Sequence, residues 1–331
     1  MAFLVCAAAG LFNAVVDTYG LVDWVEWRGF NSEKPAQQQR IKLLKAADIR
    51  RVQPRAIVLG TSRSHIGLRM SHPGWKDSSR YNAAFDGATL EENYAYLRHA
   101  EAIAPLHQVV LGIDTWQLEE NPTSVRPDFD ATLLAVPEEP WTILRMWLSD
   151  LRLVLSIDTF SASVSTLLSQ GHGEPNWFAA DGQRLGPEFF RRPREEYEKK
   201  SPRAYFLSID RQEISFKLPS VQISSRPVSA PVPAPINSFE FLRRIVEFCR
   251  EKEIDLRIFI TPAHAHQIEI AAAMGEWERV EQCKRDLVRL LSSDAGEHGT
   301  PLVPLWDFSG DSSLTDASLP LPRERREMRF Y

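Results

Sequence analysis

The sequence predicts an α/β fold in which helices cover both faces of a parallel sheet, and two observations lead to this prediction. Short apolar runs typical of buried strands occupy residues 55–60, 109–113 and 256–260, and a weaker run interrupted by Pro304 follows at 302–306. Amphipathic helical patterns occupy residues 90–104, 239–251 and 276–291. Apolar strands that alternate with amphipathic helices are typical of a sheet buried on both faces, so we expect a three-layer domain.

The N-terminal segment, residues 1–20, is interpreted as a membrane anchor or the remnant of a signal-anchor. Ala2 to Val16 is apolar except for Asn13, and no Lys or Arg precedes Arg28. As a helix, about 15 residues reach roughly 22 Å, which is short of the ~30 Å hydrocarbon core. We therefore expect an anchor whose N-terminal part is missing, with an ordinary buried helix as the alternative. An anchor would place the rest of the chain outside the cytoplasm, in the periplasm or at the cell surface.

The remaining chain divides into a spacer and one domain. Residues 21–54 are polar and include a helical stretch at 40–52, so they are interpreted as a spacer. Residues 55–331 are predicted to form the α/β domain, with a helical insertion at about 121–237. The insertion contains a long helical pattern at 141–168, a mixed-charge run at 191–200 typical of a solvated helix face, and a Pro/Ser-rich connector at 219–235.

Composition and charge restrict the class of protein. The 331 residues are 44% hydrophobic and 25% charged, which excludes a mainly disordered, collagen-like or polytopic membrane chain. With a net charge of −5 the chain has no overall excess of basic residues to bind a phosphate backbone, so nucleic acid is not expected as a partner. The three cysteines have no C-x-x-C spacing and leave the compartment open.

The loops after the strands are the places to search for chemistry, because ligands of open parallel sheets bind at the carboxyl ends of the strands. Ser62 follows the first strand on a turn led by Gly60, and this position projects a hydroxyl above the sheet. Its own N–H lies at a helix start, which suits a developing oxyanion. Ser62 is therefore a candidate nucleophile, and a helix-capping serine is the alternative.

Two further loops offer candidate partners for Ser62. In the second loop, Gly87 lets a backbone N–H approach a reacting carbonyl, and the Asn82 amide is a possible oxyanion donor. In the third loop, Asp114 follows Gly112 and could orient a partner or cap the next turn.

His264 and His266 follow the strand at 256–260 and form a His-x-His pair. Two ligands are too few for a metal site, and no third candidate has a supporting spacing, so we expect no metal and no cofactor. The alternatives are contact with substrate, service as a substitute base, or a helix start with no catalytic role.

Together these loops resemble the SGNH (GDSL-like) hydrolase superfamily, in particular its membrane-anchored extracytoplasmic members linked to acyl modification of cell-surface polymers. The resemblance covers residue 34 to the C-terminus apart from the insertion, and its motifs are short. Gly60-Thr61-Ser62 matches the Gly-x-Ser block, and Gly87 matches the glycine of the second block. The third block, Gly-x-Asn in the family, has Asp114 here, and a carboxylate cannot donate the oxyanion hydrogen bond.

The last block of the family, Asp-x-x-His, supplies the base and the carboxylate that orients it, and it does not occur in the last 60 residues. The sequence is therefore interpreted as truncated at its C-terminus, or as a product that never had the base.

The resemblance implies an SGNH/flavodoxin-like sheet and a serine esterase or O-acyltransferase that acts on a cell-envelope carbohydrate or acylated polymer. Hydrolysis and transfer share the acyl-enzyme, so the sequence does not separate them. Because the Asp-x-x-His block is absent, we expect the chain to be nearly inactive unless His264 or His266 serves as the base. The first alternative is a non-catalytic SGNH-like module that binds glycan or assembles with other envelope proteins. The second is a cytoplasmic α/β protein that binds a small ligand.

Overall fold

The computed structural model describes most of the chain. The described residues are 2–22, 26–118, 129–134, 141–171, 177–185, 203–204, 207–208, 211, 214, 238–310, 312 and 315. The mixed-charge run at 191–200, the Pro/Ser-rich run at 219–235 and the last sixteen residues, 316–331, lie outside them.

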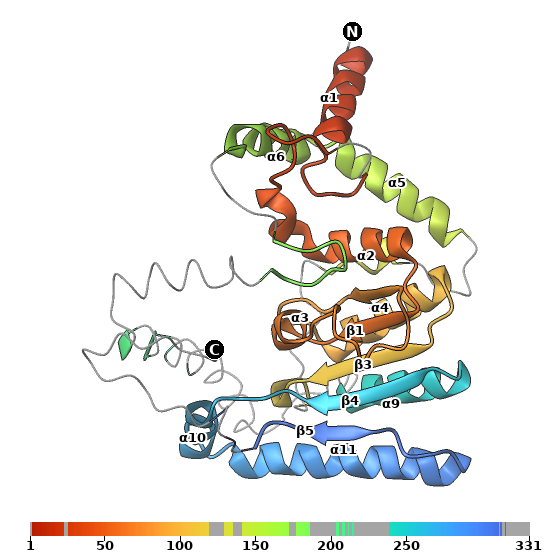
Figure 1. The fold of residues 1–331 in the computed structure, drawn as a ribbon, viewed down its shortest axis with the longest axis vertical. Coiled ribbons are helices and arrows are strands. Elements are labelled where there is room, and N and C mark those ends of the chain that lie inside the picture. The colour runs from red at the N-terminus through yellow and green to blue at the C-terminus, as the bar shows by residue number, and fades with distance from the viewer. Residues whose placement is uncertain are drawn as a thin grey trace, which may run out of the picture. The chain divides into compact units, whose positions relative to one another are not determined.

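The strands form one parallel sheet flanked by helices, which confirms the predicted fold class (Figure 1). The strand order is β2-β1-β3-β4-β5, the order of flavodoxin-like sheets. In the register, Ile57 pairs with Tyr81, and Phe259 pairs with Trp306. The strands are β1 (Ala56–Leu59), β2 (Arg80–Asn82), β3 (Gln108–Ile113), β4 (Asp255–Ile260) and β5 (Leu305–Asp307).

The chain divides into two compact units, where the sequence predicts a single domain after residue 55. Unit 1 comprises Met1–Ala88, Glu92–Val109 and Val125–Glu188. Its helices are α1 (Ala2–Val16), α2 (Ile41–Val52), α3 (Ser62–Gly67), α4 (Leu90–Ile103) from Glu92 onward, α5 (Thr142–Val154) and α6 (Ile157–Ser169), with short 3-10 helices η1 (Pro35–Arg40) and η3 (Ala131–Leu133). β1 is buried along its whole length, as its run of apolar residues requires.

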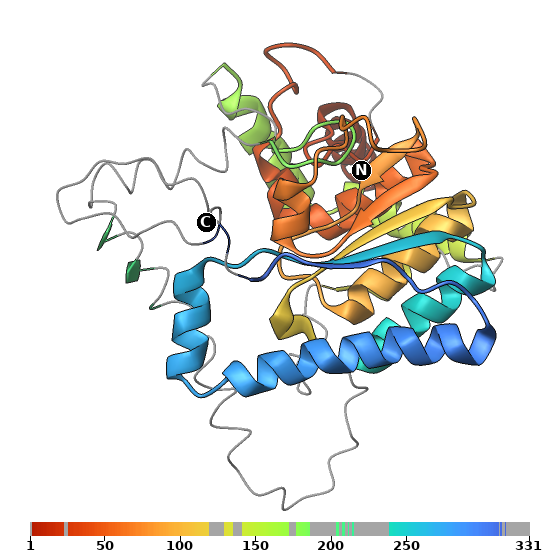
Figure 2. The same ribbon diagram turned by 60° about the horizontal axis from the view of Figure 1, so that its bottom comes forward.

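Unit 2 comprises Thr89–Glu91, Val110–Ser124 and Phe189–Tyr331. In it α9 packs on β4, and α11 packs against α9, where the two helices lie side by side in Figure 2. The apolar face of α9 is buried through Leu242, Ile245 and Cys249. Its elements beyond β4 and β5 are η2 (Thr115–Leu118), α9 (Ser238–Glu251), α10 (Ala265–Ala273) and α11 (Trp277–His298).

The prediction that residues 21–54 form a spacer is wrong for the helical part of this segment, because α2 belongs to the core of unit 1. Charged side chains of α2 are buried and paired: Lys42 forms an ion pair with Glu92 at 2.7 Å, and Asp48 accepts a hydrogen bond from the Tyr81 hydroxyl at 2.7 Å. The polar residues that suggest a solvated spacer therefore form buried ion pairs and hydrogen bonds in the structure.

Two other boundaries differ from the sequence prediction. The helical pattern at 141–168 is two helices, because the chain turns at Leu155 and the Ser156 hydroxyl caps α6 by accepting from the Thr159 N–H at 3.1 Å. The last strand begins at Leu305, one residue after Pro304, since proline has no N–H for the ladder. The Pro304 carbonyl still accepts from the Ile258 N–H at 2.9 Å.

Among the described residues, no single helix is both long and apolar enough to cross a membrane. Leu144–Val154 and Ile157–Ser169 pass the length and composition test only as a pair bent by 62°.

Gly182 tests how tightly unit 1 is packed, with Gly171 as a matched control. Both have φ near +77°, but a Cβ at Gly182 would lie 2.5 Å from Tyr81 Cζ, whereas a Cβ at Gly171 meets nothing within 4 Å. We expect Gly171→Ala to lower the free energy of unfolding by about 1 kcal/mol through backbone strain. Gly182→Ala should cost roughly 1–3 kcal/mol more through overpacking. Urea unfolding of both variants measures the difference, and equal losses would contradict the described packing.

Candidate functional site

The loop after β1 presents one accessible hydroxyl. Gly60 has φ +137°, which favours glycine, and its N–H donates to Asn93 Oδ1 at 3.0 Å. Thr61 is buried and caps α3 by accepting from the Arg63 N–H, and Ser64 is buried as well. Ser62 is half-buried, and within the described part of the chain its hydroxyl has no hydrogen-bond partner. Of the three hydroxyls in this loop, Ser62 is therefore the one that a ligand can reach.

The loop that carries Gly87 lies beside the Ser62 loop. The Ala83 N–H donates to the Val58 carbonyl at 2.9 Å, and the Phe85 N–H donates to the Gly60 carbonyl at 3.3 Å. Gly87 follows with φ +66°, a conformation that favours glycine. The structure thus brings the predicted nucleophile loop and the predicted oxyanion glycine loop together at the carboxyl end of β1.

Asn82 is close to this loop but its amide is already used. Its Nδ2 lies 3.3 Å from the carbonyls of Ser64 and His65 and 3.5 Å from that of Leu68, and its Oδ1 accepts from the Ala84 N–H at 3.1 Å. The side chain is buried. Asn82 therefore holds the end of α3 in place, and the geometry does not support its predicted role as a free oxyanion donor.

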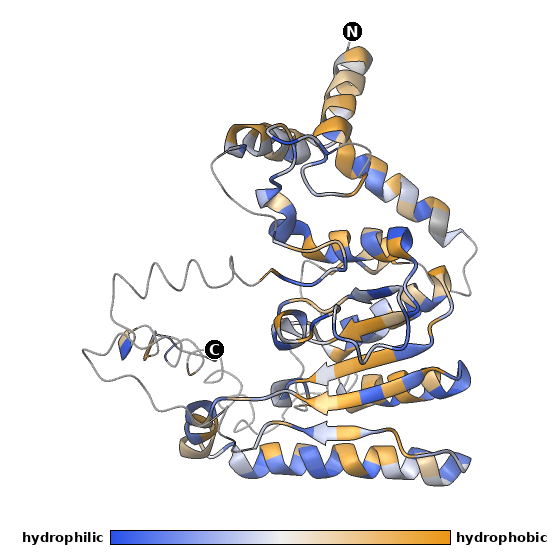
Figure 3. Cartoon of the chain, in the orientation of Figure 1, coloured by the Kyte–Doolittle hydropathy of each residue, from blue (hydrophilic) through white to orange (hydrophobic). Residues whose placement is uncertain are grey.

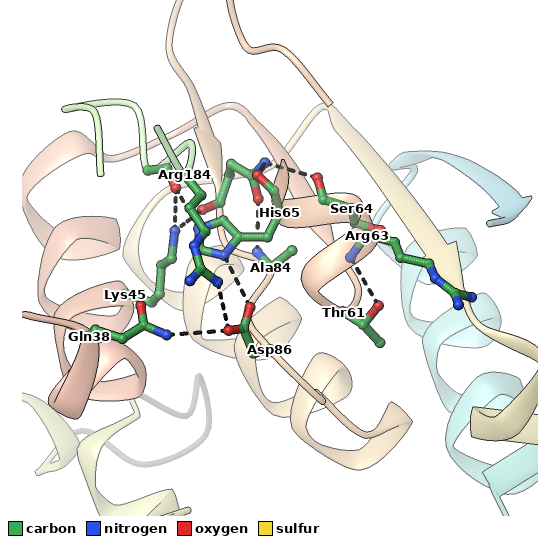
Figure 4. A network of polar contacts seen from close by, with 11 residues as sticks. Gln38, Lys45, Thr61, Arg63, Ser64, His65, Ala84, Asp86 and Arg184 are labelled. Carbon is green, nitrogen blue, oxygen red and sulfur yellow. Dashed lines mark hydrogen bonds and ion pairs between the residues drawn. The ribbon is translucent and has the colours of Figure 1, made fainter. Parts of the chain in front are cut away.

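A buried polar cluster that includes Lys45, His65, Asp86 and Arg184 lies next to the two loops (Figure 4). The Lys45 ammonium donates to the carbonyls of Asn82 and Gly182, at 2.6 Å and 2.5 Å. Burial lowers the pKa of Lys45 to about 7, although the nearby carboxylates of Asp48, Asp181 and Asp86 act in the opposite direction.

Asp86, one residue before Gly87, forms the other side of the cluster. Its Oδ2 pairs with Arg184 at 2.7 Å and accepts from Gln38 at 3.3 Å, while its Oδ1 lies 3.9 Å from His65 Nδ1. Burial alone would raise the pKa of Asp86, but the adjacent His65 ring and Arg184 guanidinium outweigh it and bring the pKa to about 2. Asp86 is therefore ionised at neutral pH and fixes the chain next to Gly87.

His65 is the buried, neutral member of the cluster. Its ring stacks on Phe178, and its Nε2 lies 3.2 Å from the Gly182 carbonyl. Burial, and then the Lys45 charge, lower the pKa of His65 to about 3. A histidine this weakly basic is unsuited to accept a proton from a serine at neutral pH.

Sequence reasoning did not select these four residues, although a signal was present for two. His65 and Asp86 lie inside the two loops that the sequence singled out, three residues after Ser62 and one before Gly87. No sequence pattern indicates that Lys45 and Arg184 belong to the cluster, because their partners come from segments that are distant in the sequence.

In unit 2, Asp114 follows the last residue of β3 and binds Thr261, which follows the last residue of β4. Asp114 is buried and accepts hydrogen bonds from the Thr261 hydroxyl and, at 3.0 Å, from Trp116 Nε1. Its backbone N–H donates to Gln117 Oε1 at 2.8 Å. Asp114 thus joins two strand ends and orients η2.

His264 and His266 also belong to unit 2, at the start of α10. His264 is the N-cap of α10, and its Nδ1 accepts from the His266 N–H at 3.2 Å. This geometry favours the helix-start interpretation for His264. Among the residues that the structure describes, no group of three or more His, Cys, Asp or Glu side chains is arranged to hold a metal ion.

The predicted site residues are thus divided. Ser62, Gly87 and Asn82 lie in unit 1, and Asp114, His264 and His266 lie in unit 2. No protein-family model matches the chain, and no curated protein matches it either.

The His65 environment predicts a pH-dependent loss of stability. His65 is neutral in the folded state down to about pH 3, whereas in the unfolded chain it takes up a proton near its ordinary pKa of 6.5. The unfolded state therefore binds more protons between these values, and stability falls as the pH falls through 6.5. We expect a contribution of up to about 1.4 kcal/mol per pH unit that His65→Gln removes. Chemical unfolding from about pH 7 down to pH 4 tests this. Burial also lowers the pKa of His99, to about 4, so both proteins lose some stability through His99. Parallel curves for parent and variant would therefore contradict the prediction for His65.

The link between Asp114 and Thr261 is tested by a double-mutant cycle. Asp114→Asn keeps the shape but weakens the acceptor, and Thr261→Val removes the donor. We expect a coupling free energy of about 1.5–3 kcal/mol, because the bond is buried and one partner is charged. Urea unfolding of the two single variants and the double variant gives the coupling, and additive losses would show that the two side chains act independently.

Proposed function

We propose that this chain is an SGNH-like serine esterase or O-acyltransferase that acts on a cell-envelope carbohydrate, with Ser62 as its nucleophile. The observation that carries the proposal is the position of the Ser62 hydroxyl. Ser62 is half-buried, unlike the buried Thr61 and Ser64, it follows the first strand of a parallel sheet on a glycine turn, and it lies in a loop hydrogen-bonded to the Gly87 loop. Ligands of such sheets bind at this edge.

The proposed reaction begins when Ser62 Oγ attacks the carbonyl carbon of an ester and its proton passes to a base. The N–H groups of Ser62 and Gly87 would stabilise the negative oxygen of the tetrahedral intermediate. The alcohol then leaves with a proton, and an acyl-Ser62 ester remains. Water as the next acceptor gives hydrolysis, whereas a sugar hydroxyl gives transfer. Within unit 1, His65 is unsuited as the base because it is buried and has a pKa of about 3.

The proposed location is the cell envelope, with residues 1–20 at the membrane and the remaining chain outside the cytoplasm. The proposed substrate is a carbohydrate or acylated polymer, and other envelope proteins are proposed partners. This part rests on the resemblance of the Gly60-Thr61-Ser62 and Gly87 loops to the SGNH superfamily.

A non-catalytic SGNH-like module is the second candidate function, and two observations favour it. The Asn82 amide is occupied by backbone carbonyls of α3, and Asp114, where the family has an asparagine, is an acceptor for Thr261. Neither residue then donates to an oxyanion. Such a module would bind glycan or assemble with envelope proteins without turnover.

Labelling with a fluorophosphonate probe tests the nucleophile. We expect the parent protein to be labelled at Ser62 and Ser62→Ala to lose the label. Hydrolysis of an aryl acetate should fall by roughly 10³-fold or more in the same variant. Ser64→Ala is the matched control, since its hydroxyl lies two residues away but is buried, and it should keep both signals.

Equal labelling of Ser62→Ala and the parent would contradict the proposal. An unlabelled parent that retains binding to envelope polysaccharide would support the non-catalytic module instead.

A further inference from the structure

Helix α6 has its polar and apolar faces reversed relative to a helix of a water-soluble domain. Its buried residues are all hydroxylic: Thr159, Ser163 and Thr166. Its opposite face exposes large apolar side chains at the spacing i, i+3, i+7 and i+11, from Ile157, 85% exposed, to Leu168, 73% exposed. A helix in water buries its apolar face, so this face calls for an apolar environment. The four exposed residues are Ile157, Phe160, Val164 and Leu168.

Helix α5 continues this apolar surface. Its exposed apolar residues fall on one helix face at i, i+3, i+4, i+7 and i+11, and Trp141 precedes them at the helix start, 77% exposed. The face turned inward includes Thr142 and Met146, which are buried. The five residues of the exposed face are Leu144, Trp147, Leu148, Leu151 and Leu155.

Hydrogen bonds between buried polar groups join α1, and the residues just after it, to α5 and α6. Asn13 of α1 is buried, and its amide donates to the Val154 carbonyl at 2.7 Å. The hydroxyls of Thr18 and Thr166 share a hydrogen bond at 2.5 Å. Gly10 allows close approach, since a Cβ there would lie 2.5 Å from Leu155 Cδ2. Small residues and hydrogen bonds between helices, with apolar side chains outside, are the packing pattern of helices in lipid.

The apolar surface extends onto α1. Leu4 and Leu11 are exposed on α1, and the Phe12 ring contacts the Phe160 ring of α6 with centroids 5.3 Å apart. Figure 3 shows hydrophobic colours along most of α1. We define the exposed apolar residues of α1, α5 and α6 as the apolar platform of unit 1.

Charge and aromatic residues at the border of the apolar platform favour a lipid surface as its occupant. Arg152 is exposed on one flank of the α5 stripe and suits anionic headgroups, while Asp158 is the exposed acidic residue of α6. Trp141 and Trp147, both largely exposed, are of the type enriched at the boundary between headgroups and acyl chains.

We infer that the apolar platform docks unit 1 onto an anionic phospholipid bilayer, with α5 and α6 inserted in one leaflet. The inferred contact lies beyond the anchor proposed for residues 1–20, and it is independent of the chemistry of Ser62. A bent pair of helices, 13 residues each, with one apolar face lies in the interface rather than crossing it. The consequence is that unit 1 is held against the membrane along two helices in addition to α1.

Vesicle flotation of the full chain tests this inference. The probes are vesicles of phosphatidylethanolamine with phosphatidylglycerol and vesicles of phosphatidylcholine alone. We expect the parent to float with the anionic vesicles and the double variant Phe160→Glu, Leu168→Glu to bind at least about tenfold less, with α1 intact in both. The matched control, Val288→Glu with Leu302→Glu, changes two exposed apolar residues of unit 2 and should bind like the parent.

A second measurement covers the possibility that the charged variant is misfolded. In a Cys6→Ser background, a fluorophore sensitive to its environment is placed at Leu168→Cys or, as control, at Leu302→Cys. We expect blue-shifted emission and quenching by acyl-chain spin labels at position 168 only. Equal flotation of parent and platform variant, or quenching at neither position, would overturn the inference. A platform variant that changes only the oligomeric state would also overturn it, and would indicate a protein contact.

Discussion

The arrangement of unit 1 depends on one buried ammonium group. Lys45 reaches from α2 to the carbonyl of Asn82, at the end of β2, and to the carbonyl of Gly182, in the segment 177–185. Three segments that are far apart in sequence are thereby joined at one point. The amide side chain of Asn82 in turn binds the last carbonyls of α3, the helix that Ser62 begins. The position of the candidate nucleophile is therefore set by hydrogen bonds that lead back to Lys45, and not by the glycine turn alone.

The second loop is fixed by the same cluster through a different pair. Asp86 is held by Arg184, and its neighbour Gly87 has the positive φ that a sharp turn requires. Since Arg184 and Gly182 come from one segment, that segment contacts both the Ser62 side and the Gly87 side of the candidate site. His65 fills the space between them as a neutral ring, because Lys45 and burial oppose its protonation. The cluster thus has a supporting role, and its members are positioning residues for the proposed chemistry.

Four of the five strands of the sheet and most of the described helices could be predicted from the sequence because they depend on local patterns. Short apolar runs ended by a glycine, such as residues 56–59, favour buried strands, and the face of α9 is evident from its spacing. Long-range contacts account for what was missed. At the break between α5 and α6, the Val154 carbonyl accepts a hydrogen bond from the Asn13 amide, 141 residues away. The buried Lys45 donates to the Gly182 carbonyl, 137 residues away. The reversed faces of α6 could not be predicted either. A helical pattern shows that one face is apolar, but it does not show which face packs against the protein.

The most direct test of the central claim, that Ser62 is a nucleophile held by these loops, is peptide mass spectrometry of the parent after brief incubation with an aryl acetate and acid quenching. The account predicts an acetyl group on Ser62, because an acyl-enzyme forms before either hydrolysis or transfer. Acetylation confined to exposed lysines, with Ser62 unmodified, would contradict it.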